Sequence, residues 1–257
     1  MKRFSRIALL ILILLSACSS IPGLEFTNTP SPVPTLTFTS APTETSTPMP
    51  TATRDIIATL EAQQTQAAGG VLSDLNKIMA DSDIEYQNGK LIWQEEEAEI
   101  VKLSGPDGRF IPIDEKLTSG NFILKSDVTW QATGIIVCGV IFRSEPNLRE
   151  GKQYQFLFLR YSGLPAWAIE FHDFGYFKNS PTSVKYSSAV NQKNETTNQV
   201  LFIAQDEEFT VYINGVRQGK FFDNSKQQTE GSFAFLGYQD SGEGSCKFEN
   251  SWIWELK

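Results

Sequence analysis

Short runs in which apolar and polar residues alternate follow one another from about residue 84 to the end of the chain. Alternation places every second side chain on the same face of an extended strand. Turn-forming residues separate the runs and no long helical pattern interrupts them, which predicts an all-β, antiparallel two-sheet sandwich over residues 83–257. The eleven runs are GKLIWQ, AEIVKL, NFILKSDVTWQA, GIIVCGVIFR, YQFLFLRY, AWAIEF, QVLFIA, EFTVYI, VRQGKFF, GSFAFLGYQ and CKFENSWIWEL.

Helical periodicity precedes the strands, in residues 55–82. Asp55 can cap the start of a helix, and Gly69-Gly70 predicts its end. After the glycines, the spacing of apolar residues predicts a second helix that packs against the sandwich and holds no cofactor. The residues on its apolar face are Val71, Leu72, Leu75, Ile78 and Met79.

The first 17 residues have the layout of a signal peptide. Lys2, Arg3 and Arg6 precede the apolar run ALLILILLSA, which is shorter than a membrane-spanning helix. The run ends in Leu-Ser-Ala-Cys18, which resembles the lipobox of bacterial lipoproteins. The resemblance implies cleavage before Cys18, acylation of its thiol and an extracytoplasmic protein anchored to the bilayer of the cell membrane or outer membrane. The alternatives are an ordinary signal peptide and a short membrane anchor.

Residues 18–54 connect this anchor to the helical segment. Ten Thr, three Ser and six Pro occur between residues 27 and 54. A segment of this composition cannot bury enough apolar surface to fold, and its prolines favour an extended conformation. Fully extended, these residues would reach roughly 85 Å. We therefore predict a linker that holds the sandwich away from the membrane.

Export determines how the two remaining cysteines are interpreted. Cys138 lies within GIIVCGVIFR, and Cys246 begins the last run. An even number of cysteines outside the cytoplasm predicts a disulfide between them, and two unpaired buried thiols are the alternative. For a loop of this length, chain entropy alone would stabilise the fold by roughly 4–5 kcal/mol.

The charge of the chain limits its partners. The net charge is −8, and residues 1–54 hold four basic and two acidic residues, so the rest of the chain carries −10. An acidic body disfavours binding to nucleic acid and to anionic lipid surfaces. Attachment to the membrane is therefore assigned to the acyl anchor alone.

The stretch FTVYINGVRQGKFFD, residues 209–223, contains the most specific turn signal. Asn214-Gly215 favours a two-residue hairpin turn, which would pair Ile213 with Val216 and Tyr212 with Arg217. A Gly-led strand and a final paired strand follow, in TEGSFAFLGYQ and FENSWIWEL. This succession resembles the concanavalin A-like lectin and glucanase superfamily, which includes laminin-G-like domains. The resemblance implies a jelly-roll sandwich that recognises or cleaves carbohydrate.

Catalytic residues of that superfamily are not evident. Its retaining glycosidases carry Glu-x-Asp-x-(x)-Glu on one strand, where alternate carboxylates share a face. The nearest stretch is IEFHDF, in which Glu170 and Asp173 are three positions apart and lie on opposite faces. His172 is the single histidine, and no nucleophile or phosphate-loop motif accompanies it. We predict no catalytic residue and no metal ligand.

Calcium is considered as a cofactor because lectin-like sandwiches commonly bind it. Two acidic stretches, Asp223-Asn224 and Asp240-Ser241-Gly242-Glu243, offer oxygen ligands. Acidic loops are more commonly solvated loops without a metal. We expect no cofactor, with calcium as the alternative.

One hairpin suggests a ligand-binding face. With SGLP as its loop, Tyr161 would lie opposite Ala166 and Phe158 opposite Ile169. One face would then be apolar core, and the other would mix alanine with polar and aromatic groups, as a sugar site requires. The predicted ligand-binding residues are Gln155, Tyr161, Glu170 and His172. The alternative is that the helix at 71–81 covers this face and that Glu170 and His172 pair locally.

Together these features predict a tethered lipoprotein whose sandwich binds glycan or another extracellular polymer without catalysis. One alternative is an enzyme that cleaves a glycoside or keto-sugar, with Glu170, His172 or Asp173 converging. Another is a structural protein that docks against a protein of the cell envelope.

Overall fold

The computed structural model describes residues 53–79, 82–161 and 163–257, with side chains from residue 58 onward. The predictions for the signal peptide, for Cys18 and for most of the linker fall on residues 1–52 and lie outside the described residues. Among the helices of the described residues, none is long and apolar enough to span a membrane.

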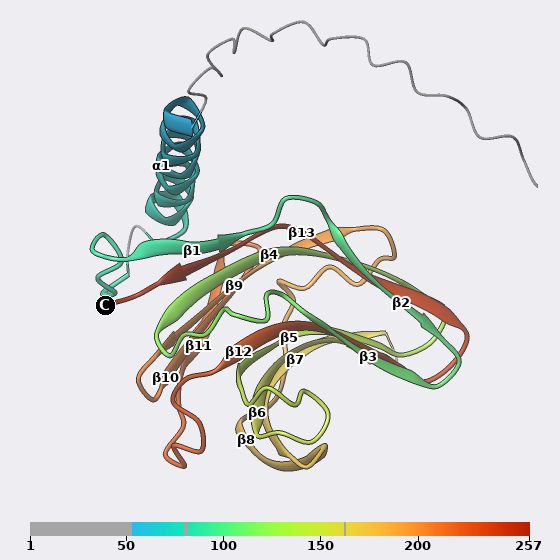
Figure 1. Cartoon of the computed structure of the whole chain (residues 1–257). Coiled ribbons are helices and arrows are strands. Elements are labelled where there is room, and N and C mark those ends of the chain that lie inside the picture. Colours follow the sequence, from blue (N-terminus) through green and yellow to red (C-terminus); the bar gives the residue numbers. More distant parts are fainter. Residues whose placement is uncertain (1–52, 80–81, 162) are drawn as a thin grey trace, which may run out of the picture. The chain divides into compact units, whose positions relative to one another are not determined.

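The helical segment is one helix, α1 (Thr53–Ile78), which continues through Gly69 and Gly70 (Figure 1). The prediction that these glycines end a first helix is therefore wrong. A glycine in a helix costs only about 1 kcal/mol relative to alanine. The packing of the residues that follow offsets this cost.

Two antiparallel sheets make up the body of the described chain, so the predicted jelly-roll sandwich is confirmed (Figure 1). The seven-stranded sheet contains β1 (Lys90–Gln94), β2 (Glu99–Ser104), β4 (Phe122–Ala132), β9 (Thr197–Gln205), β10 (Glu208–Ile213), β11 (Val216–Phe222) and β13 (Glu243–Glu255). The six-stranded sheet contains, in spatial order, β3 (Asp107–Pro112), β12 (Ser232–Gln239), β5 (Ile136–Ser144), β6 (Gln153–Tyr161), β7 (Leu164–Asp173) and β8 (Tyr176–Tyr186).

Two of these strands, β3 and β8, were not predicted from the sequence. Both lie at the edges of the six-stranded sheet, where one side of a strand needs no hydrogen-bonding partner. Strand β8 even contains Pro181, which an edge strand tolerates because the missing N–H can face outward. These two edge strands therefore lack the apolar alternation from which the other strands were predicted.

The hairpin between β10 and β11 forms as predicted. Ile213 pairs with Val216 and Tyr212 pairs with Arg217. Asn214 and Gly215 have φ angles of 50° and 76°, the positive values that a two-residue hairpin turn of this type requires. The Asn214 side chain also accepts a hydrogen bond from the Gln199 amide, at 2.8 Å.

The Cys138–Cys246 disulfide is present and joins the two sheets. Cys138 lies on β5 and Cys246 on β13, with their Cα atoms 5.6 Å apart. Both side chains belong to the core between the sheets, which is rich in phenylalanine and tryptophan. The bond therefore links the central strand of one sheet to the long C-terminal strand of the other.

Helix α1 packs on the outer face of the seven-stranded sheet. As predicted, its apolar stripe is the docking surface, with Val71, Leu75 and Met79 buried. The sheet residues they contact include Trp252 and Trp254 of β13. The alternative that the helix covers Glu170 and His172 is wrong, because those residues lie on the outer face of the other sheet.

Candidate ligand-binding surfaces

The hairpin of β6 and β7 has a shorter turn than the sequence suggested. Tyr161 pairs with Leu164, so the predicted pairing of Tyr161 with Ala166 is wrong by two residues. A shift of two preserves the faces of both strands, because side chains alternate with a period of two. The predicted outer face is therefore correct, and Gln155 now lies directly opposite Glu170.

Three of the four predicted ligand-binding residues come together on this outer face. Glu170 Oε2 lies 2.9 Å from His172 Nε2, and both side chains are partly accessible to solvent. Gln155 is buried, and its Oε1 has no hydrogen-bond partner among the described residues. This polar cluster therefore contains one acceptor without a partner in the described structure, Gln155 Oε1, and two side chains that solvent can reach, Glu170 and His172.

Tyr238 of β12 belongs to the same cluster and was not predicted. Burial raises the pKa of Tyr238 to about 12, the Glu170 carboxylate adds to this shift, and a hydrogen bond from Gln155 opposes it. Its ring lies against Gly108, where a Cβ atom would come within 2.6 Å of it. Alternation along SFAFLGYQ would have placed Tyr238 on this face, but the sequence does not reveal that β12 lies beside β5.

Tyr161, the fourth predicted residue, lies away from the cluster, at the hairpin end of β6. It is nevertheless on the same face and is exposed. Aromatic and aliphatic side chains on this side of the sheet remain uncovered: Tyr161 (51% exposed), Leu164 (49%), Phe177 (56%) and Tyr186 (64%). Together with Glu170 and His172, these residues form a surface that we term the edge strip.

The edge strip follows β7 and β8 lengthwise. Phe177 pairs with His172 at one end, and Tyr186 pairs with Ala166 six residues further along β7. With a rise of about 3.3 Å per residue, the strip is roughly 20 Å long. The His172 and Phe177 rings meet edge to face, with centroids 6.2 Å apart. Polar and aromatic groups are thus adjacent at that end.

Asp173 does not join this cluster. It pairs with Tyr176 beside the turn and lies on the opposite side of β7 from Glu170. Along the strands of the six-stranded sheet, all of which are described, Glu170 is the carboxylate on the outer face. Of the three residues that the enzyme alternative requires, Glu170 and His172 therefore come together and Asp173 does not.

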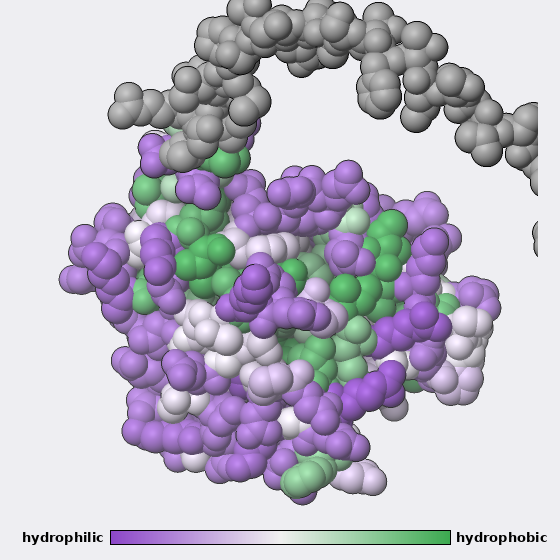
Figure 2. Space-filling model, in the orientation of Figure 1, coloured by the Kyte–Doolittle hydropathy of each residue, from purple (hydrophilic) through white to green (hydrophobic). Residues whose placement is uncertain are grey.

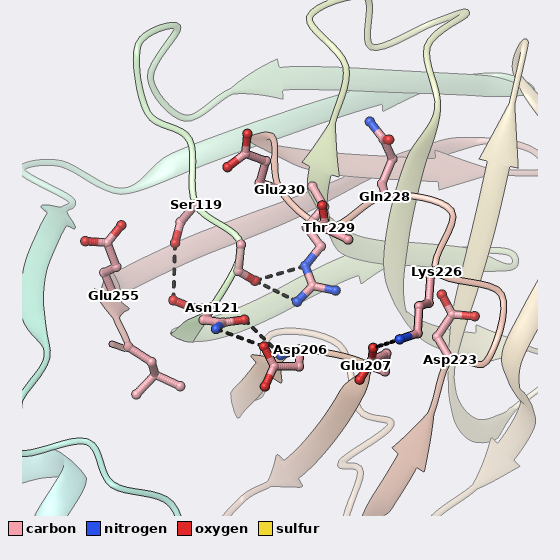
Figure 3. Close-up of a pocket in the computed structure, with 13 residues that line it drawn as sticks. Ser119, Asn121, Asp206, Glu207, Asp223, Lys226, Gln228, Thr229, Glu230 and Glu255 are labelled. Carbon is pink, nitrogen blue, oxygen red and sulfur yellow. Dashed lines mark hydrogen bonds and ion pairs between the residues drawn. The ribbon is translucent and has the colours of Figure 1, made fainter.

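A separate cavity lies at one end of the sandwich, where five segments of the chain meet (Figure 3). We term it the end pocket, and its volume is about 410 Å³. Sequence reasoning did not find it, because its residues come from loops and strand ends that are far apart along the chain. The lining residues are Ser119, Gly120, Asn121, Arg143, Asp206, Glu207, Asp223, Lys226, Gln228, Thr229, Glu230, Glu255 and Leu256.

Arg143 is the buried cation of the end pocket. Its φ angle of 48° is in the left-handed region, which interrupts the alternation of β5. The guanidinium lies over the Phe209 ring, 5.5 Å from its centroid, and donates two hydrogen bonds to the Gly120 carbonyl. Burial lowers the pKa of Arg143, and the neighbouring carboxylates oppose that shift.

The stretches considered for calcium already bind protein donors. Asp223 accepts hydrogen bonds from the Tyr154 hydroxyl and from the Ser225 amide, the latter at 2.9 Å. Asp240 accepts one from the Ile135 amide at 2.9 Å, and Glu243 accepts one from the Ser104 hydroxyl at 2.7 Å. No group of three acidic, histidine or cysteine side chains in the described part of the chain is arranged to hold a metal ion.

The fold and these surfaces define a two-sheet antiparallel sandwich with one open outer face and a polar pocket at its end. No protein-family model matches this sequence, and no curated protein matches it either. The carbohydrate binding module CBM66 from Bacillus subtilis is similar in structure. It aligns with 60% of this chain and 86% of its own, with 16% identity and a TM-score of 0.48.

Two further solved structures resemble this chain. A protein of unknown function with a galectin-like fold from Bacillus subtilis aligns with 67% of this chain and 100% of its own, at 8% identity and a TM-score of 0.47. The Bacillus licheniformis beta-glucanase aligns with 68% of this chain and 90% of its own, at 11% identity and a TM-score of 0.43. At these values the likeness extends to the sandwich architecture and no further.

Proposed function

We propose that this chain is a lipid-anchored extracytoplasmic protein whose sandwich binds a linear glycan along the edge strip, without cleaving it. The observation that carries the proposal is the exposure of aromatic side chains beside the Glu170–His172 pair, on the sheet face that α1 leaves open. Sugar rings present apolar C–H faces that stack on aromatic rings and hydroxyls that need fixed polar partners. The edge strip supplies both.

The length of the strip favours a polymer over a single sugar. Phe177 and Tyr186 are separated by six residues of the neighbouring strand, or roughly 20 Å. An extended chain of several sugar units would contact both ends at once. The polar pair lies at the Phe177 end, so we assign specificity to that end and additional stacking to the other.

The arrangement of carboxylates favours binding over hydrolysis. Glycoside hydrolysis ordinarily uses two carboxyl groups, about 5–9.5 Å apart, on either side of the scissile bond. Glu170 has a histidine, not a second carboxylate, as its close partner on this face. Along the described strands of this face no second carboxylate accompanies Glu170, which is why we favour binding over cleavage.

The predicted anchor and linker would place glycan binding at the cell surface. Acylation of Cys18 would hold the chain at the bilayer, and the Thr- and Pro-rich residues would separate it from the sandwich. A tethered sandwich of this kind would retain polymer near the cell surface.

The test is a polysaccharide array probed with the full-length lipidated protein in detergent. We expect binding in the millimolar to micromolar range, and Phe177→Ala should weaken it about tenfold, since the loss of one stacking contact is worth roughly 1.4 kcal/mol. The matched control is Phe222→Ala on β11, because Phe222 is equally exposed, at 55%, but lies on the other sheet.

A blank array, or equal binding by Phe177→Ala and wild-type protein, would contradict glycan binding. Capture of one envelope protein by the wild type, lost in Phe177→Ala, would instead support the docking alternative. Release of reducing ends from the bound glycan, abolished by Glu170→Gln with His172→Ala, would support the enzyme.

A further inference from the structure

Most of the charged groups that line the end pocket have an ion-pair or hydrogen-bond partner within the protein. Lys226 forms an ion pair with Glu207, and Lys90 pairs with Glu255 at 2.9 Å. The remaining acidic groups near the floor are hydrogen-bonded: Asp206 by the Asn121 amide, at 3.3 Å, and Asp223 by Tyr154. Figure 3 shows the Asp206–Asn121 and Glu207–Lys226 contacts side by side.

Two charged groups of the lining, Arg143 and Glu230, keep polar atoms that have no partner in the described structure. Arg143 is only 3% exposed, yet it forms no ion pair with any carboxylate of the described residues. Its hydrogen bonds to Gly120 use Nε and Nη2, so Nη1 has no protein partner and is available to the pocket that Arg143 lines. The carboxylates of Asp206, Asp223 and Glu207 favour the charge of Arg143 from a distance. A bound carboxylate would add the direct charge-assisted hydrogen bond that Nη1 lacks.

Glu230 is the corresponding anion. Its side chain is exposed on the loop between β11 and β12, lines the same pocket and has no hydrogen-bond or ion-pair partner in the described structure. The pocket therefore presents Nη1 of the buried Arg143 and the carboxylate of the exposed Glu230 to a ligand. Gln228, Thr229 and Ser119 contribute neutral donors and acceptors to the same lining (Figure 3).

We infer that the end pocket binds a small zwitterion, a molecule with one carboxylate and one ammonium group such as an amino acid. The carboxylate contacts Nη1 of Arg143, and the ammonium contacts the Glu230 carboxylate. A simple anion would meet the surplus of acidic groups around the pocket, and a simple cation would leave Arg143 unpaired. No aromatic residue lines the pocket, which separates it from the edge strip and its proposed glycan.

The experiment measures binding to the full-length protein by saturation-transfer NMR and calorimetry. The probes are glycine, β-alanine and γ-aminobutyrate, which place the two charges at increasing separation, with acetate and methylamine as singly charged references. We expect one of the zwitterions to bind at least about tenfold more tightly than either reference. No binding by any zwitterion, or acetate binding as tightly as all of them, would overturn the inference.

Two variants locate the binding. Glu230→Gln should weaken the zwitterion about tenfold and leave acetate unchanged, because only the ammonium contact is lost. Glu96→Gln, on an exposed turn outside the pocket, is the matched control and should change neither. Arg143→Lys should weaken zwitterion and acetate alike by removing the planar fork. Equal zwitterion affinity in Glu230→Gln and wild type would refute the assignment even if Arg143→Lys failed to fold.

Glycan binding to the array serves as the readout that separates the two proposals. Glu230→Gln should bind glycan as wild type does, and Phe177→Ala should bind the zwitterion as wild type does.

Discussion

The outer faces of the two sheets differ in what covers them and in what remains exposed at the margin. On the seven-stranded sheet, the apolar residues lie beneath α1, and Leu75 of the helix is completely buried among them. On the six-stranded sheet, the edge along β7 and β8 leaves Tyr161, Phe177 and Tyr186 exposed. Figure 2 shows hydrophobic surface at the foot of the helix and in further patches across the face drawn.

The difference indicates which face serves stability and which is available to a ligand. Burying apolar area contributes about 25 cal/mol per Å², so a face covered by a helix stabilises the fold. Exposed aromatic residues make no comparable contribution, and clusters of them mark interaction surfaces. The chain contains a helix able to cover one face, and that helix covers the face opposite the edge strip.

The largest expected effect comes from opening the covered face. Leu75→Ala should lower the free energy of unfolding by about 2–5 kcal/mol, since it leaves a cavity between helix and sheet. Leu164→Ala, on the edge strip, is the matched variant and should change it by less than about 0.5 kcal/mol. Urea unfolding of the full-length protein, followed by tryptophan fluorescence, measures both. An equal loss of unfolding free energy in the two variants would mean that the covered face contributes no more to stability than the edge strip does.

Alkaline pH provides the second test, because it compares the interior with the outer face of the six-stranded sheet. Tyr154 lies between the sheets and Tyr238 on the outer face, yet burial raises the pKa of each to about 12. A raised tyrosine pKa means that the unfolded chain ionises first, at about pH 10. The stabilisation is therefore complete below pH 10 and is lost as the pH rises towards 12.

We expect stability to fall across this window by roughly 2–3 kcal/mol for the fully buried Tyr154, and by less for the partly exposed Tyr238. Tyr154→Phe and Tyr238→Phe should each make this loss of stability with pH less steep, whereas Tyr176→Phe, at the exposed start of β8, should not. Urea unfolding at a series of pH values measures the slopes. If the unfolding free energy of Tyr238→Phe falls with pH as steeply as that of wild type, then water reaches the Tyr238 hydroxyl in the folded protein.

Most of the sandwich could be predicted from alternation and turn chemistry, and the parts that were missed share a physical cause. Strands β3 and β8 lie at sheet edges, where a strand can be polar and can contain Pro181. The hairpin register was missed by two residues, yet the faces remained correct because their period is two. The local sequence pattern thus predicts which face of a sheet a side chain lies on better than it predicts which strands become neighbours.

The residues of the candidate sites also divide into those that local pattern predicts and those that depend on distant strands. Gln155, Glu170 and His172 were found because they lie on adjacent strands of one hairpin. Tyr238 and Arg143 were not, because their positions depend on which distant strands become neighbours and on a left-handed backbone at Arg143. Nothing in the local sequence around GIIVCGVIFRS indicates that the arginine turns inward.

The smallest expected effect concerns the far end of the edge strip and depends on the length of the ligand. Tyr161 lies at the hairpin end, six residues along β6 from Gln155, or roughly 20 Å away. A short oligosaccharide held by Glu170 and His172 would not reach it, whereas a long chain would. Tyr161→Ala should therefore weaken a long polysaccharide about threefold, or about 0.6 kcal/mol, and leave a disaccharide unchanged.

Titration of both ligands on the same variant provides the measurement, with Val216→Ala on the other sheet as a control of similar exposure, at 53%. An equal loss for short and long ligands would mean that Tyr161 acts through the fold of the hairpin and not through contact. An equal loss in Val216→Ala would mean that the polymer also contacts the seven-stranded sheet. Only a loss that grows with ligand length, and only on the open face, fits a strip that binds an extended chain from end to end.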